Sequence, residues 1–202
     1  WGPAIVNMGI YHTVNLIPIH KNGYNLVELS TEQLYGDNDE ITLNVDIDVH
    51  NYVKTDVPVS LKVKFDNEEK EVPIPVNEPG EHRYNVIFST KGKERWNVHG
   101  YGKQTLYPLT ATLSDQTITK KIGIRKLIVD CHDDEFGTSL QFVVNGTIIN
   151  ALGANFIPTD SLPSRATKER TYQLMQDMIE SNMNIVRVWG GGYFDDVIAD
   201  IC

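Results

Sequence analysis

Two side chains capable of chemistry lie at the end of an apolar run near the C-terminus. Arg187 and Trp189 alternate with Val186 and Val188, and three glycines, Gly190–Gly192, follow the indole. Glycine loops that bind phosphate have the spacing GxGxxG or GxxxxGK[ST], and neither spacing occurs at this point. An indole followed by small residues suits instead the flat face of a sugar ring, which stacks on an aromatic surface. The pattern therefore favours a binding pocket over a phosphate loop.

Two structural explanations stay open for the same residues. A buried arginine paired with a neighbouring carboxylate accounts for Arg187, and ordinary core packing accounts for Trp189. In an α/β barrel, however, side chains at the carboxyl ends of the strands line the active site. Asn155 occurs at that end of one predicted strand, and Arg187 and Trp189 occur at that end of the next. We therefore expect these three side chains to contribute to one site.

The residues that must position this site alternate between strand and helix. The stretch 153–158 predicts a strand, and 184–192 predicts a second, fully buried strand. Between them, Thr167 is suited to cap a helix that has Glu169 in its first turn. An apolar stripe at spacings of three and four marks the packing face of that helix: Tyr172, Met175, Ile179 and Met183. A second helix is expected over 194–202, so this region predicts the start of a parallel α/β fold.

Residues 14–130 have a different pattern, in which polar turns separate one strand from the next. Strands are predicted over five stretches: 41–53, 58–65, 82–89, 105–113 and 117–129. Their number and spacing predict an immunoglobulin-like β-sandwich of about 110 residues. A further hairpin is expected where Asn145-Gly146 separates two apolar runs, and it is favoured over a glycosylation sequon at Asn145-Gly146-Thr147.

The composition limits the partners and cofactors. The chain of 202 residues has a formal charge of −9. This charge argues against nucleic acid or an anionic membrane surface as a partner, because both bind basic patches. The acidic runs at 37–40 and 66–70 are interpreted as solvated turns. No metal or organic cofactor is implied, since the histidines lack paired spacing and Cys131 and Cys202 have neither metal-ligand nor disulfide spacing.

Three stretches, in this order, resemble the β-mannosidases of glycoside hydrolase family 2. They are WGPAIVNMGIYHTVNL at the start, RWNVHGYGKQTLYPLTATL in the middle, and the region from FVVNGTIINALGANFIPTDSLPSR to NMNIVRVWGGGYFDD at the end. The resemblance is strongest in GANFIPTDSLPSR and NMNIVRVWGGG, and residues 20–93 carry almost none of it. One departure is Trp96-Asn97-Val98, which stands where the family has Trp-Trp-Pro.

The resemblance implies three domains of a longer protein. Residues 1–14 would end a jelly-roll sugar-binding-type domain, residues 15–126 would form the immunoglobulin-like sandwich, and residues 127–202 would begin the catalytic (β/α)8 barrel. Two βα units cannot close a barrel of eight, so we expect an internal fragment that needs the missing parts of its own chain. The compartment stays open between lysosomal, periplasmic and cytoplasmic, because any signal would lie before residue 1.

The family chemistry is retaining hydrolysis of terminal non-reducing β-D-mannose from oligosaccharides. It uses two glutamates, one as nucleophile and one as acid/base. In the family both lie on later barrel strands, so we assign no catalytic residue here and expect the fragment to be inactive. Alternatives are another family 2 specificity, such as β-galactosidase, β-glucuronidase or exo-β-glucosaminidase, and a non-catalytic carbohydrate-binding sandwich.

The resemblance also implies supporting roles for five residues. Arg187 matches an arginine that holds the nucleophile in its ionised form, as a nearby cation favours a carboxylate. Trp189 matches an aromatic wall of the sugar subsite. Asn155 and Asp160 match first-strand positions near the pocket, and Trp1 belongs to a Trp-Gly-Pro segment that reaches toward it.

Overall fold

The computed structural model describes residues 6, 8–10, 13–54, 58–75, 78–190 and 196–202. The chain divides into two compact units. The larger unit comprises Ile17–Asn97 and Lys103–Thr147, and the smaller one comprises Trp1–Leu16, Val98–Gly102 and Ile148–Cys202. The described part of the chain holds no helix with the length and apolar character needed to cross a bilayer.

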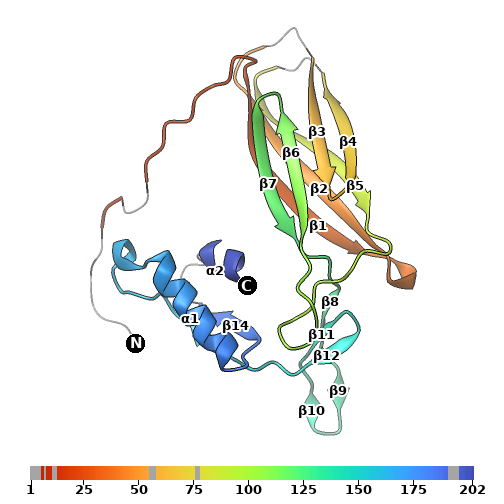
Figure 1. Cartoon of the computed structure of the whole chain (residues 1–202), viewed down its shortest axis with the longest axis vertical. Coiled ribbons are helices and arrows are strands. Elements are labelled where there is room, and N and C mark those ends of the chain that lie inside the picture. The colour runs from red at the N-terminus through yellow and green to blue at the C-terminus, as the bar shows by residue number, and fades with distance from the viewer. Residues whose placement is uncertain (1–5, 7, 11–12, 55–57, 76–77, 191–195) are drawn as a thin grey trace. The chain divides into compact units, whose positions relative to one another are not determined.

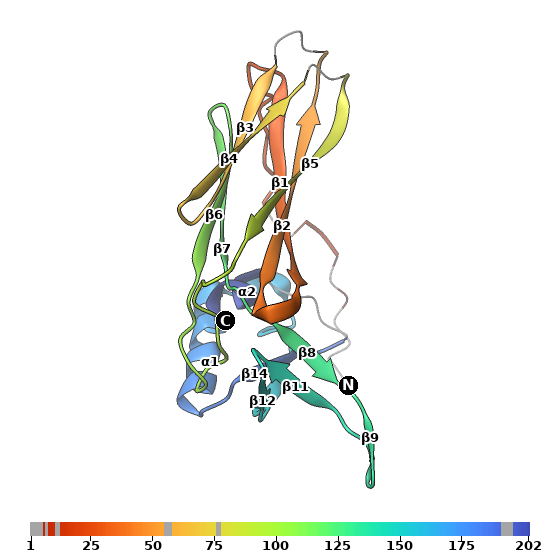
Figure 2. The same cartoon turned by 90° about the vertical axis from the view of Figure 1, so that its right-hand side faces the viewer.

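The larger unit is a β-sandwich of two antiparallel sheets, whose layers are separated in Figure 2. The first sheet has the order β1-β2-β5, with bounds Tyr24–Tyr35, Ile41–Asn51 and Gly80–Ser89 (Figure 1). The second has the order β4-β3-β6-β7, with bounds Glu68–Ile74, Val59–Phe65, Tyr107–Leu113 and Gln116–Ile122. In a constant-type immunoglobulin domain the fourth strand pairs with the fifth. Here β4 pairs with β3, so the order is of immunoglobulin type with one edge strand in the other sheet.

Alternating side chains of both sheets form the core between them. The inward side chains of β2 are at most 1% exposed: Ile41, Leu43, Val45, Ile47 and Val49. Across the two sheets, the ring centroids of Phe65 and Phe88 lie 5.7 Å apart. Burying each such side chain stabilises the fold by about 1.5–3 kcal/mol before chain entropy is counted. Four predicted strands are confirmed: 41–53, 58–65, 82–89 and 105–113.

The prediction of a single strand over 117–129 is wrong, because β7 ends before Gly123 and a separate ribbon follows. Gly123 lies against an indole, and a Cβ at this position would come within 2.9 Å of Trp96 Cγ. The side chain of Gln33 in β1 binds the same segment. It donates to Gly123 O at 2.8 Å and accepts from Arg125 N at 3.0 Å. Contacts with residues distant in sequence therefore interrupt this strand.

A second glutamine connects β7 to β1 at the end of these strands opposite to Gln33. Gln116, the first residue of β7, donates to Tyr24 O at 2.9 Å and accepts from Leu26 N at 2.8 Å. Each of the two amides thus supplies the donor and acceptor that a neighbouring strand would supply. Four backbone groups, at Tyr24, Leu26, Gly123 and Arg125, are therefore bonded by side chains and are not available for pairing with another strand.

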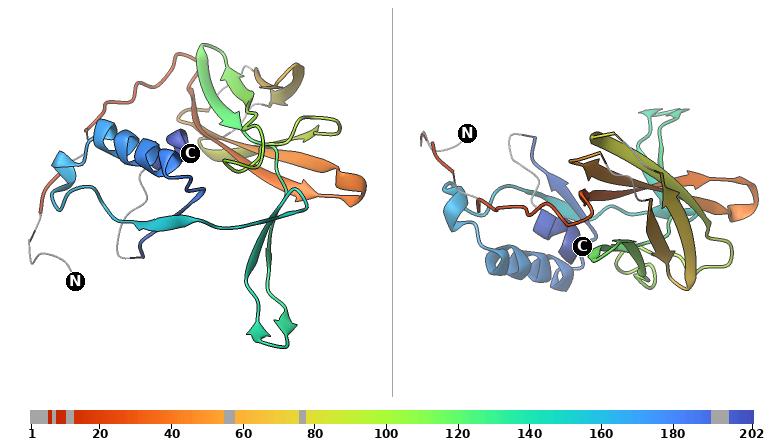
Figure 3. Two further views of the ribbon diagram at one scale, coloured as in Figure 1. Left: turned by 60° about the horizontal axis from the view of Figure 1, so that its bottom comes forward. Right: turned by 90° about the horizontal axis from the view of Figure 1, so that it is seen from above.

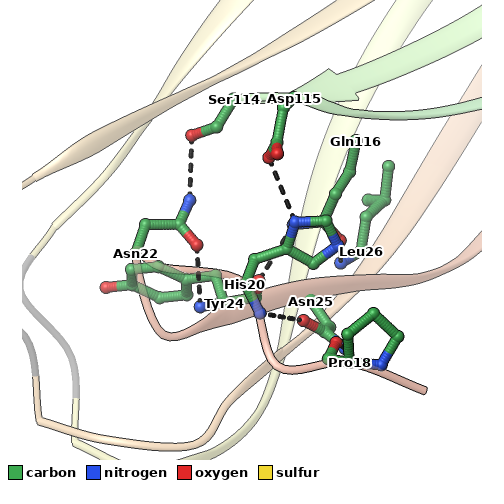
Figure 4. A network of polar contacts seen from close by, with 9 residues as sticks. All are labelled: Pro18, His20, Asn22, Tyr24, Asn25, Leu26, Ser114, Asp115 and Gln116. Atoms are coloured by element: carbon green, nitrogen blue, oxygen red, sulfur yellow. Dashed lines mark hydrogen bonds and ion pairs between the residues drawn. The ribbon is translucent and has the colours of Figure 1, made fainter. Parts of the chain in front are cut away.

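A polar network joins the segment before β1 to the turn between β6 and β7 (Figure 4). Asp115 Oδ1 lies 3.1 Å from His20 Nδ1, and Asn22 Nδ2 donates to Ser114 Oγ at 2.8 Å. His20 N also donates to Asn25 Oδ1 at 3.3 Å. These bonds fix the N-terminal end of the sandwich at its surface.

The two acidic runs differ in structure. The first forms a short 3-10 helix, η1 (Asp37–Asp39), between β1 and β2, in agreement with a turn. The second is only partly a turn, since β4 begins at Glu68. There Lys70 Nζ pairs with Glu68 Oε1 at 3.2 Å. The interpretation of 66–70 as a turn is therefore wrong for its last three residues.

A narrow ribbon follows the sandwich in sequence, with β8 and β11 side by side (Figure 3). Its strands are β8 (Leu127–Asp130), β9 (Asp133–Asp134), β10 (Gly137–Thr138) and β11 (Gln141–Val144), and β12 (Thr147–Ile149) comes after the next turn. At that turn Asn145 and Gly146 have φ angles of 50° and 83°. Two positive φ angles in succession define the type I′ hairpin turn. The hairpin predicted at Asn145-Gly146 is confirmed.

The side chain of Asn145 is occupied by three hydrogen bonds. Its Nδ2 donates to Trp96 O at 2.9 Å and to Asn97 Oδ1 at 3.0 Å. Its Oδ1 accepts from Lys126 N at 2.9 Å. A glycan on this nitrogen would remove at least one of these bonds, so the hairpin turn explains the residue better than the sequon does.

The smaller unit contains one parallel strand–helix–strand arrangement (Figure 1). Its elements are β13 (Gly153–Phe156), η2 (Pro163–Arg165), α1 (Lys168–Glu180), β14 (Ile185–Val188) and α2 (Asp196–Ile201). Thr167 caps α1 as predicted, because its Oγ1 accepts from Arg170 N at 3.2 Å. The parallel pairing of β13 with β14 agrees with the predicted α/β start, whereas the complete barrel stays a prediction.

The prediction of a fully buried strand over 184–192 is wrong. The side chains of β14 are half-buried, and that of Arg187 is exposed, so the strand is not fully buried. On α1, Met175 is buried, but Tyr172 is 54% and Ile179 is 37% exposed. A sheet of two strands covers less apolar surface than a full barrel sheet, which leaves the predicted packing face of α1 partly open.

Candidate functional site

The parallel register of β13 and β14 brings two of the predicted site residues together. Asn155 is the direct partner of Arg187 in this register. Arg187 Nη1 donates to Asn155 Oδ1 at 2.9 Å. Directly opposed residues on neighbouring strands project from the same face of a sheet. The guanidinium and the amide therefore form one polar group at the carboxyl end of the strand pair.

Trp189 continues the strand pair beyond its last regular residue. Its backbone N–H donates to Phe156 O at 3.0 Å, and its side chain is 41% exposed. Since strand side chains alternate in direction, the period of two assigns Trp189 to the same face as Arg187. The partial exposure of Trp189 leaves part of its aromatic surface open to a ligand.

A glycine and an asparagine at the opposite end hold the two strands in this register. A Cβ on Gly153 would lie 1.8 Å from Ile185 O, so the close approach of the strands requires glycine. Asn184 Oδ1 accepts from Leu152 N at 3.0 Å, and Asn184 Nδ2 donates to Asn150 O at 3.0 Å. Sequence reasoning missed the role of Asn184, which acts through residues more than thirty positions away.

Asp160 lies in the loop between β13 and α1 and has its own partners. Its Oδ1 accepts from Leu162 N at 2.8 Å, and its Oδ2 forms an ion pair with Arg165 Nη2 at 2.8 Å. The side chain of Asp160 is 21% exposed and that of Arg165 is 67% exposed. Sequence reasoning named Asp160 but missed Arg165, although the two occur five residues apart in one loop.

The environment of Arg187 does not match the alternative in which this arginine forms a buried ion pair with a carboxylate. Within the described residues this side chain is exposed, and its hydrogen-bond partner is an amide oxygen, not a carboxylate. Trp1 lies outside the described residues. The ligand-binding and supporting roles of Arg187, Trp189, Asn155, Asp160 and Trp1 all stay predictions.

The described residues contain no group of three or more histidine, cysteine, aspartate or glutamate side chains arranged to hold a metal ion. The polar groups that meet at the carboxyl end of the strand pair are one guanidinium and one amide, and a carboxylate, Asp160, occurs in the loop that follows β13. Groups of these kinds can donate hydrogen bonds to hydroxyls and accept hydrogen bonds from them.

Comparison with known proteins gives a consistent result. No protein-family profile matches the chain. The Beta-mannosidase B of Aspergillus niger is 33% identical over 100% of this chain and 24% of its own length. The Beta-mannosidase B of Aspergillus terreus is 31% identical over 97% of this chain and 23% of its own length. The chain thus spans about a quarter of the length of the curated relatives it matches.

Solved structures share the fold. The β-D-mannosidase of Dictyoglomus thermophilum superposes with a TM-score of 0.80 at 26% identity, over 90% of this chain and 23% of that one. An exo-chitosanase of Amycolatopsis orientalis gives 0.70 at 19% identity, over 89% of this chain and 21% of that one, which shows the fold alone. In sequence and fold, the chain therefore resembles a segment of a glycoside hydrolase of family 2. The two curated relatives and the solved structure at 26% identity all carry the name β-mannosidase.

Proposed function

We propose that the protein containing this chain is a retaining exo-glycosidase of family 2 that removes terminal β-D-mannose from the non-reducing ends of oligosaccharides. The observation that carries the proposal is the similarity of the whole chain to proteins named β-mannosidase. The polar pair of Asn155 and Arg187 at the carboxyl end of two parallel strands supports it, because barrel enzymes build their active sites at that end.

Each site residue has a proposed role in this reaction. Arg187 keeps the nucleophilic carboxylate ionised by placing a cation beside it, and Asn155 orients the guanidinium through its amide oxygen. Trp189 offers its ring to the apolar face of the sugar. Asp160 accepts hydrogen bonds from sugar hydroxyls near the pocket. Trp1 belongs to the preceding domain and extends toward the pocket.

The reaction itself requires two glutamates about 5–5.5 Å apart, one as nucleophile and one as acid/base. We assign neither to this chain, so we propose that residues 1–202 alone are inactive. The proposed division of the chain follows the family: 1–14 from a jelly-roll domain, 15–126 as the sandwich, and 127–202 as the start of the catalytic barrel. Other parts of the same protein would then complete the pocket.

A second specificity within the family is the nearest alternative. A β-galacturonidase of Eisenbergiella tayi and a β-glucuronidase of Bacteroides uniformis share the fold at 17% identity. The walls of the pocket that would separate these sugars lie on other barrel strands.

A non-catalytic carbohydrate-binding sandwich is less well supported. Such a module needs exposed aromatic side chains grouped on one face. In and next to the strands of the two described sandwich sheets, the exposed aromatic residues are Tyr35 and Tyr52, whereas Tyr101 lies in the loop between β5 and β6 and Phe136 lies in the ribbon after β8. Tyr35 pairs with Ile41 and the residue before Tyr52 pairs with Tyr24, which puts the two tyrosines at opposite ends of the β1–β2 hairpin. They do not form one platform.

The test is an assay of the full-length protein on aryl β-mannoside, β-galactoside, β-glucuronide and β-glucosaminide, with residues 1–202 as the control. The proposal expects the highest kcat/KM on the mannoside and no turnover by residues 1–202. A preference for another sugar would retain the chemistry and reject the mannoside specificity. Turnover by residues 1–202 would reject the assignment of the catalytic glutamates to other parts of the protein.

A further inference from the structure

The ion pair in the loop between β13 and α1 holds both oxygens of one carboxylate. Arg165 Nη2 lies 2.8 Å from Asp160 Oδ2, and Leu162 N donates to Asp160 Oδ1 at 2.8 Å. An ionised carboxylate has about four acceptor sites, so about two remain available for a ligand. The geometry thus fixes the orientation of the carboxylate without using up its hydrogen-bonding capacity.

Stability is a weak reason for this arrangement. The guanidinium is 67% exposed, and exposed ion pairs contribute little to folding. The carboxylate is the more enclosed partner, at 21% exposure. An exposed arginine that holds a more enclosed carboxylate in one orientation is an arrangement suited to recognition. In the same loop, Thr159 Oγ1 is buried and has no hydrogen-bond partner among the described residues, so a second polar group of this loop lacks an acceptor or donor.

We propose that Arg165 is a positioning residue. It orients the carboxylate of Asp160 so that the carboxylate accepts hydrogen bonds from two hydroxyls of the sugar. This inference rests on the proposed function, because it requires the carboxyl end of β13 to face the glycoside. The loop begins directly after that end, where Asn155 lies. The ligand class is a neutral hexose with neighbouring hydroxyls, since hydrogen bonds from hydroxyls to a carboxylate are charge-assisted and directional.

A double-mutant cycle on the full-length enzyme tests the coupling. The variants are Arg165→Gln, Asp160→Asn and both together, assayed on whichever aryl glycoside the enzyme hydrolyses best. Each single change is expected to lower kcat/KM by about 10- to 100-fold, the effect of losing a hydrogen bond to a charged group. Because Arg165 acts through Asp160, the double variant should be no worse than Asp160→Asn alone. Arg170→Gln, a change at an exposed arginine of α1, should leave kcat/KM as in the wild type.

A second readout needs no activity. In Arg165→Gln the amide of Leu162 should exchange with deuterium faster than in the wild type, because the carboxylate that accepts it is no longer held from the other side. Arg165→Lys keeps the charge but loses the planar fork, so it should give intermediate values in both measurements. If Arg165→Gln proves insoluble, the lysine variant supplies the same comparison.

Three results would overturn the inference: additive losses in the cycle, a wild-type kcat/KM in Arg165→Gln, or unchanged exchange at Leu162. None of these depends on which sugar is preferred, since the cycle uses the best substrate. A preference for a sugar other than mannose would reject the proposed specificity and leave the positioning role intact.

Discussion

Arg187 donates to Asn155 at 2.9 Å across β13 and β14, and the two residues are direct partners in the parallel register. A slip of one residue between the strands would turn one of these side chains to the opposite face. The pair therefore exists only while α1 returns the chain in this register. Gly153 and Asn184, at the other end of the strands, hold that register in place.

Removing either member of this pair should weaken hydrolysis by the full-length protein. Arg187→Ala is expected to lower kcat/KM by about 10²–10³-fold, because a charged group preorganised in the active site is lost. Asn155→Ala removes one hydrogen bond to the guanidinium and is expected to cost about tenfold. Steady-state kinetics on the best aryl glycoside measure both. Near-normal activity of Arg187→Ala would contradict the proposed role.

Trp189 should contribute through its ring. Trp189→Ala is expected to lower kcat/KM by about tenfold or more, whereas Trp189→Phe keeps part of the stacking surface and should lose less. Tyr52→Ala is the matched control, because this aromatic residue after β2 is also exposed, at 39%, but is no candidate for the pocket. Equal losses in the tryptophan and tyrosine variants would point to stability instead of binding.

Acid should weaken the sandwich through one ion pair. Arg83 Nε and Nη2 donate to the two carboxylate oxygens of Asp48 at 2.7 and 2.8 Å, which holds the pKa of Asp48 below its ordinary value of 3.8. Because the pKa is lower in the folded state, the stabilisation is complete above pH 3.8 and is lost as the pH falls through the folded pKa. The effect should be small, since the pair is exposed.

Urea unfolding at pH 7 and at pH 3 measures this contribution. Asp48→Asn should lower the urea midpoint at pH 7 and reduce the difference between the two pH values. Asp37→Asn changes an aspartate in η1 and serves as the control. The same drop in both variants would show that general charge effects, and not the pair with Arg83, cause the acid sensitivity.

Gly153→Ala should separate β13 from β14. Its Cβ would lie 1.8 Å from Ile185 O, a backbone atom that no change of rotamer can move. A loss of about 1–3 kcal/mol or more in the stability of the strand pair is expected for such overpacking. Faster hydrogen exchange at the Asn184 amide, which donates to Leu152 O at 2.7 Å, would report it.

Gly190→Ala is the matched control for that substitution. Among the described residues, no atom lies within 4 Å of a Cβ built on Gly190, so the added methyl group meets none of the atoms of β13 or β14. Exchange at Asn184 should then stay at the wild-type rate. If both alanine variants behaved alike, the close approach of the strands at Gly153 could not be the reason for the glycine.

Sequence reasoning succeeded where interactions between neighbouring residues decide the structure. Thr167 caps α1 because its hydroxyl reaches an N–H three residues later. Asn145-Gly146 forms the hairpin turn because both residues tolerate positive φ. In β2, the strict alternation of aliphatic and polar residues was sufficient to predict both the strand and its buried face.

Sequence reasoning failed where contacts between residues distant in the sequence decide the structure. The stretch 117–129 was predicted as one strand, but Trp96 packs on Gly123 and Gln33 binds the backbone there, so β7 ends early. The apolar residues of β14 predict full burial, yet burial depends on how many strands and helices surround them. Arg165 carries no pattern of its own, and its ion pair with Asp160 depends on the path of one loop.

The sequence by itself determined four of the seven sandwich strands, the capped helix, the hairpin turn and the resemblance to the β-mannosidases, because each of these follows from local spacing or from a motif. Only the tertiary structure decided which side chains meet. Asn155 and Arg187 are 32 positions apart, and they touch because two parallel strands align in one register around a returning helix. Such a contact depends on the packing of whole elements, which no local stretch of sequence specifies.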